Sequence, residues 1–145
     1  MTKDIRDRVA VLMLSVLPFY HKKIFRMGHC GTGIQAAQYR VLWILIREGI
    51  LPMSELGKHL YISKPYMTKL VDQLIRDGYA ERIPDTRDRR VINISITPAG
   101  STHLHLAGVE YKADIKTILS DLNNEDLENL CQSLEKLHSI FAKID

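Results

Sequence analysis

The feature that most constrains this chain is a charged loop that leads directly into a strand pattern. Residues 84–90 (PDTRDRR) carry five charges in seven positions, and Ile92, Ile94 and Ile96 then recur at every second position. Successive side chains of a strand point to opposite faces, so this spacing predicts a strand with one apolar face. This strand is expected over residues 91–96, and residues 79–83 predict a second strand before the loop. Together they predict a hairpin whose tip is charged.

Two short helices are expected before the hairpin. Apolar spacing predicts one over residues 53–60 and another over residues 64–77, with Ser63 in the N-cap position and Gly78 at the end. Four residues share one face of the second helix and should pack inward: Met67, Leu70, Val71 and Leu74. Two helices joined by a short turn indicate a helix-turn-helix. The hairpin that follows makes the expected unit a winged helix.

Longer helices are expected on the N-terminal side. Residues 5–24 have helical spacing, but Pro18 removes a backbone hydrogen bond, so we expect a kink or break near Leu17. A second helix is predicted over about residues 35–47. Its expected apolar face consists of Ala36, Tyr39, Leu42, Trp43 and Ile46.

Two more helices are expected after the hairpin. Thr97 before Pro98 predicts a helix start, with the helix continuing to about Leu119. Asn123 and Asp126 resemble a capping box that opens a last helix. The apolar residues of that helix lie close to a heptad seam: Leu127, Leu130, Cys131, Leu134, Leu137, His138, Phe141 and Ile144. A second copy of the chain or an intramolecular helical hairpin could cover this seam, and we favour the second copy.

The predicted fold class is therefore mainly α with a small β-hairpin wing. We expect a single domain over residues 1–145, with a winged helix-turn-helix region at 33–97. Helical dimerisation regions are expected at 1–27 and 98–145.

Charge is unevenly distributed along the chain. Residues 1–90 contain 16 Lys and Arg against 9 Asp and Glu, whereas residues 91–145 contain 4 against 8. A basic part joined to an acidic part fits a protein that presents one surface to a polyanion. Duplex DNA is the polyanion that a winged helix would bind.

The candidate DNA contacts lie on two elements. The N-terminal turns of a recognition helix read base edges in the major groove, and here they offer Ser63, Lys64, Pro65, Tyr66, Thr68 and Lys69. The wing offers Asp85, Arg87, Asp88, Arg89 and Arg90. Arginine suits a narrow minor groove with negative potential. A neighbouring carboxylate could hold each arginine side chain in one orientation.

These segments resemble the MarR family of winged-helix transcription regulators over about residues 33–100. The specific motifs are TKLVDQL in the recognition helix, DTRDRR in the wing and ITPAG after it. The resemblance implies a homodimer on a palindromic operator, acting as a repressor or less often as an activator. It also implies a small anionic aromatic effector held between the dimer helices and the winged helix. By family position, Arg90 and Tyr111 would bind that effector.

Other classes of function have weaker support in the sequence. No Ser/His/Asp order, phosphate loop or paired-carboxylate motif indicates an enzyme, and no cofactor is expected. Cys30 and Cys131 lack metal or disulfide spacing, and His103 and His105 point in different directions on a helix. Cys30, beside His29, could sense oxidants, although we do not favour this reading. No signal peptide or membrane span is indicated, so a cytoplasmic protein is expected. The main alternative is a winged helix that binds an acidic protein partner.

Overall fold

The computed structural model describes residues 4–20, 22 and 34–144. By its internal contacts the chain divides into two compact units, Met1–Tyr111 and Lys112–Asp145. The elements, in chain order, are α1 (Ile5–Phe19), α2 (Ile34–Glu48), β1 (Leu51–Pro52), α3 (Met53–Leu60), α4 (Lys64–Arg76), β2 (Ala80–Pro84), β3 (Ile92–Ile96), α5 (Pro98–Ile118), a short 3₁₀ turn η2 (Leu119–Asp121) and α6 (Asn124–Phe141). The mainly helical fold with a small β wing is confirmed.

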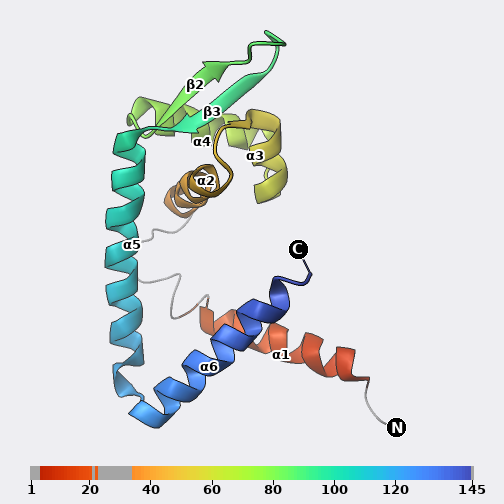
Figure 1. Ribbon diagram of the computed structural model, residues 1–145, viewed down its shortest axis with the longest axis vertical. Helices are drawn as coiled ribbons and strands as arrows, with labels where there is room; N and C mark the ends of the chain where they lie inside the picture. Colours follow the sequence, from red (N-terminus) through yellow and green to blue (C-terminus); the bar gives the residue numbers. More distant parts are fainter. Residues whose placement is uncertain (1–3, 21, 23–33, 145) are drawn as a thin grey trace. The chain divides into compact units, whose positions relative to one another are not determined.

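The core of the first unit lies where α2, α3 and α4 meet the sheet (Figure 1). All four residues predicted to face inward from α4 are buried. They pack with Leu42 and Leu45 of α2, Leu56 of α3 and Ile94 of β3. Because the inward face of α4 is fully occupied by these contacts, its opposite face is left for solvent or a partner.

The sheet has three antiparallel strands in the order β1-β3-β2. Ala80 pairs with Ile96 and Pro84 with Ile92, which fixes the hairpin, while Leu51 pairs with Ile94 on the other side of β3. The hairpin was predicted, with each strand start displaced by one residue. Strand β1 was not predicted, because two residues are too few to show an alternating pattern.

A small set of bonds joins the hairpin to α5. Thr97 accepts a hydrogen bond on Oγ1 from the N–H of Gly100 (3.0 Å) and donates one to the carbonyl of Gly78 (2.6 Å). This confirms the predicted helix start, with Thr97 as the capping residue before Pro98. At the start of α6, Asn123 Oδ1 accepts from the N–H of Asp126 at 2.8 Å, as the capping pattern predicted.

Two expectations about the N-terminal helices need correction. The buried face of α2 consists of Val41, Leu42 and Leu45, whereas Trp43 and Ile46 are about half exposed. Helix α1 continues as an α-helix through Pro18 to Phe19, without the break that was expected near Leu17, and Ile24, the expected end of the pattern, lies outside the described residues. The loop that contains His29 and Cys30 lies outside the described residues.

Candidate nucleic-acid interface

Every residue predicted to make a recognition contact is exposed at the N-cap or in the first turns of α4. Ser63, Lys64, Pro65, Tyr66, Thr68 and Lys69 are all exposed, while Met67 and Leu70 between them are buried. This alternation follows from helical spacing, because the apolar residues at three- and four-residue intervals fill the core and turn their neighbours outward. Ser63 occupies the N-cap position but makes no side-chain capping bond, so its hydroxyl group is not engaged there.

Thr68, one of the candidate recognition residues, already donates its hydroxyl hydrogen within α4. The hydroxyl group of Thr68 donates a hydrogen bond to the carbonyl of Lys64 at 3.0 Å. Its oxygen can still accept a bond, and its methyl group can make an apolar contact. Thr68 therefore fits a methyl contact with thymine or an acceptor role better than donation to a base.

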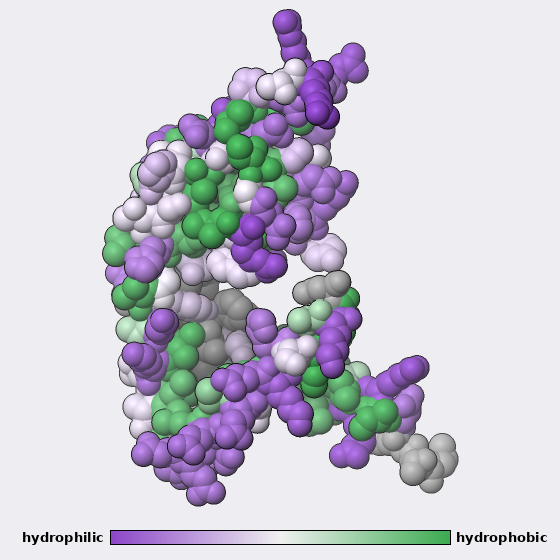
Figure 2. Space-filling model, viewed as in Figure 1, coloured by the Kyte–Doolittle hydropathy of each residue, from purple (hydrophilic) through white to green (hydrophobic). Residues whose placement is uncertain are grey.

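The hairpin tip presents three arginines to solvent. Arg87, Arg89 and Arg90 are exposed on the connection between β2 and β3. Figure 2 shows hydrophilic residues gathered at this end of the hairpin, at the top of the view. A set of guanidinium groups on a narrow hairpin is suited to phosphate or minor-groove contact.

The wing carboxylates were expected to hold the arginine side chains, but they accept hydrogen bonds from backbone amides instead. Asp85 Oδ1 accepts from the N–H of Arg87 at 2.7 Å and of Asp88 at 3.3 Å, and its Oδ2 accepts from Asn93 Nδ2 at 3.4 Å. Asp88 Oδ1 accepts from the N–H of Arg90 at 2.9 Å. These are Asx turns, which fold the tip itself and leave the guanidinium groups free to reach outward. The hydrogen bonds from the amides of Arg87 and Asp88 also lower the pKa of Asp85.

A salt bridge between Arg82 of β2 and Asp72 of α4 connects the wing to the recognition helix. Both side chains are about half exposed, so the pair is partly screened by solvent. Its structural effect is to link the two elements that carry the candidate DNA contacts. Helical spacing turns Asp72 to the outward face of α4, but spacing alone does not predict its partner on β2.

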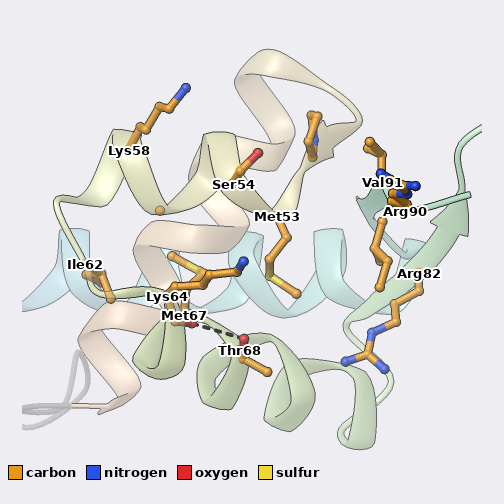
Figure 3. Close-up of a pocket in the computed structure, with 13 residues that line it drawn as sticks. Met53, Ser54, Lys58, Ile62, Lys64, Met67, Thr68, Arg82, Arg90 and Val91 are labelled. Carbon is orange, nitrogen blue, oxygen red and sulfur yellow. Dashed lines mark hydrogen bonds between the residues drawn. The ribbon is translucent and has the colours of Figure 1, made fainter. Parts of the chain in front are cut away.

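A groove of about 680 Å³ lies between α3, α4 and the hairpin (Figure 3). Four cationic residues line it: Lys58, Lys64, Arg82 and Arg90. Its apolar lining includes Met53, Ile62 and Met67. Cationic side chains around an apolar floor form a surface that attracts anions, which fits the phosphate backbone of a nucleic acid.

The positive charge of this groove is partly balanced. Lys58 donates a hydrogen bond to Glu55 Oε1 at 2.9 Å, one turn earlier in α3. The hydrogen bond and the charge of Lys58 lower the pKa of Glu55. Lys58 and Arg82 were not among the predicted contacts. The repeated basic residues near the helix-turn-helix were the signal that could have identified them.

The two residues proposed for an effector do not both line this groove. Arg90 does, whereas Tyr111 lies on α5 outside the lining.

Cys131 is a free, exposed thiol on α6. Among residues 4–20, 22 and 34–144, no three His, Cys, Asp or Glu side chains are grouped to hold a metal ion. No helix within those ranges is long and apolar enough to cross a membrane.

Comparison with known proteins gives consistent matches. The model of the MarR family matches residues 34–92. The transcriptional repressor MdtR of Bacillus subtilis is 30% identical over 105 residues, which cover 72% of this chain and 68% of that protein. The repressor YetL of the same organism is 27% identical over 130 residues, which cover 87% of this chain and 78% of that protein. The YusO protein from Bacillus subtilis, known from a crystal structure, is 26% identical in sequence and superimposes with a TM-score of 0.66. The match covers 94% of this chain and 93% of that protein.

Proposed function

Because this chain belongs to the MarR family, whose members are transcription regulators with a DNA-binding winged helix and not enzymes, we propose that it is a repressor that binds a palindromic operator as a homodimer. The observation that carries the proposal is the exposed face of α4 beside an arginine-rich hairpin. In this proposal, the first turns of α4 enter the major groove. The hairpin follows the phosphate backbone into the adjacent minor groove.

Exposed apolar residues support a second copy of the chain. The seam residues Leu134, Leu137 and Phe141 of α6 are each roughly 40% exposed. Helix α1 has no buried residue, although most of its side chains are apolar. Soluble proteins rarely leave such faces uncovered, and a symmetric dimer covers both copies of a face at once. Two-fold symmetry would place the two recognition helices about 34 Å apart, one turn of duplex, which requires a palindromic site.

Two of the relatives support repression, since MdtR and YetL are both named repressors, whereas another relative, BadR of Rhodopseudomonas palustris, is named a transcriptional activatory protein. A repressor occupies its operator and excludes polymerase. We propose release by a small anionic aromatic compound, the effector implied by the family resemblance. Arg90 supports this proposal, because its guanidinium group lines a partly apolar groove where a carboxylate could bind. Tyr111 remains a predicted contact.

The proposed function is tested by selecting genomic duplex fragments with the purified full-length protein near physiological salt. An enriched inverted repeat with half-sites about one helical turn apart is the expected result. If no fragment is enriched, the protein does not read a sequence. An affinity for duplex DNA that is weak and nearly independent of salt would favour the acidic protein partner instead, because phosphate contacts release counterions.

Binding to the selected duplex then tests the wing. Arg87→Ala and Arg89→Ala are each expected to weaken binding roughly tenfold and to make the salt dependence shallower by about one unit of slope. Circular dichroism should be unchanged because the tip is exposed. The control is Lys136→Ala on α6, which removes one positive charge from a helix that carries no predicted DNA contact. Unchanged affinity in both arginine variants would contradict the role of the wing.

A further inference from the structure

Tyr61, in the turn between α3 and α4, combines two unfavourable features. It adopts φ 53° and ψ 42°, the left-handed region, and is the single non-glycine residue with positive φ in the described ranges. Its side chain is also 96% exposed. A residue with a Cβ atom is disfavoured in this conformation, which glycine adopts readily.

The turn requires this backbone conformation but does not require an aromatic side chain. Tyr61 ends α3, and the left-handed residue lets its own N–H bond the carbonyl of Lys58 (3.3 Å) and the N–H of Ile62 bond that of Gly57 (3.2 Å). Glycine would make both bonds without strain. The nearly complete exposure means that the ring adds almost no packing in return. An unfavourable residue that folding does not explain indicates a function outside the folded core.

The position of Tyr61 indicates which partner it meets. In the chain it stands two residues before Ser63, the N-cap of α4. It also falls between Lys58 and Lys64, which both line the cationic groove (Figure 3). The end of a recognition helix that enters the major groove passes close to the phosphates at the groove edge. A phenol can donate a hydrogen bond to a phosphate oxygen there, without adding a charge.

We propose that Tyr61 is a DNA contact that donates its phenol hydrogen bond to a backbone phosphate beside the recognition helix. This proposal rests on the proposed DNA-binding function and adds a residue that lies outside both the recognition helix and the wing. A phosphate contact positions the protein on the duplex and carries no base information. Its loss should therefore weaken binding to any duplex to the same extent.

The test uses the full-length protein and two variants, Tyr61→Phe and Tyr61→Gly, with the duplex selected above and a shuffled duplex of equal length. Tyr61→Phe removes only the hydroxyl group, so the melting temperature should not change while affinity for both duplexes falls roughly fivefold to tenfold. The slope of affinity against salt should also stay the same, because no charge is lost. Tyr61→Gly should lose as much affinity, and its melting temperature should rise by roughly 2–5 °C as the strain is relieved.

Each alternative result has a separate meaning. If the unmodified protein binds no duplex, the proposed function fails and the role of Tyr61 fails with it. If it binds and Tyr61→Phe binds equally well, only the role of Tyr61 is overturned. A loss in Tyr61→Gly without a loss in Tyr61→Phe would assign the effect to the ring or to the turn. A loss confined to the selected duplex would indicate a base contact in place of the phosphate contact.

Discussion

Asp85 illustrates how a single carboxylate can fold a loop that is too exposed to be stabilised by packing. Its two oxygens accept bonds from two backbone amides and from the side chain of Asn93 on the returning strand. These bonds connect the descending and ascending sides of the hairpin tip. The arginines of the wing are then presented from a defined backbone, so less conformational freedom is lost when they bind DNA.

The same bonds predict a pH dependence of the hairpin tip. The hydrogen bonds lower the folded-state pKa of Asp85 from its ordinary value of 3.8. The contribution of Asp85 to the stability of the hairpin tip is therefore fully present above that pH. The contribution is lost as the pH falls through the lowered folded-state pKa. In NMR titrations, the amide signals of Arg87 and Asp88 should therefore stay constant above about pH 4 and shift below it. Asp85→Asn should abolish this transition, whereas Asp121→Asn, on an exposed turn, should preserve it. A transition that survives in Asp85→Asn would contradict the assignment.

Side chains that follow a simple period were predictable from the sequence, and those that depend on a partner were not. Met67, Leu70 and Leu74 are buried as predicted, because helical spacing alone separates an inward from an outward face. The proximity of the two wing carboxylates to the arginines was visible, but an Asx turn and an ion pair have similar sequence patterns. The left-handed conformation of Tyr61 could not be predicted, because a tyrosine gives no signal of positive φ.

At the scale of elements, the first turn of α5 packs directly on the base of the hairpin. Gly100 is buried there, and a Cβ atom at this position would overlap the carbonyl oxygen of Tyr79 and come within 2.9 Å of Ile96 Cγ1. The same carbonyl accepts the N–H of Thr97 at 3.1 Å. The glycine in the segment ITPAG therefore has a physical reason, which is the close approach of a helix to a strand end.

Gly100→Ala is expected to destabilise the protein by about 1–3 kcal/mol, because a backbone carbonyl cannot move aside as a side chain could. Gly108→Ala is the matched control on the same helix. Its Cβ would meet only the hydroxyl oxygen of Tyr39 at 3.5 Å, an ordinary contact, so the change should stabilise α5 by up to about 1 kcal/mol. Urea unfolding of both variants measures the difference. Equal stability of the two would show that α5 can shift away from the hairpin without loss.

The elements themselves were mostly predictable, and the failures have specific causes. Helix α3 and the start of α4 match the expected bounds, because both helices have a clear apolar face and Ser63 occupies the N-cap position of α4. The apolar face of α2 was misassigned. This helix has apolar residues around most of its circumference, so spacing alone could not show that Val41 and Leu45 are buried while Trp43 is not.

At the scale of the whole molecule, the charge asymmetry of the sequence has a place in the structure. The excess of Lys and Arg before residue 91 includes all four basic residues of the groove and the arginines of the hairpin tip. The acidic excess after residue 91 falls largely on α5 and α6, which carry no predicted DNA contact. An acidic segment would be repelled by DNA, so the distribution favours approach through α4 and the hairpin.

The exposed apolar seam of α6 allows a direct test of the proposed homodimer. Leu134→Glu and Leu137→Glu place charges on side chains that are about 40% exposed in the single chain, so secondary structure should persist. A charge at the centre of an apolar interface should instead separate the copies. Sedimentation equilibrium is expected to give a monomer mass for the double variant and twice that mass for the unmodified protein.

Loss of the dimer should also lower operator affinity by at least about a hundredfold, because each half-site would then be bound alone. Gln132→Glu is the control. It adds the same charge two residues from Leu134, about 160° around the helix and away from the seam. If the double variant remains a dimer, the copies associate through another face. If it becomes a monomer but keeps full operator affinity, palindromic binding by two recognition helices is contradicted.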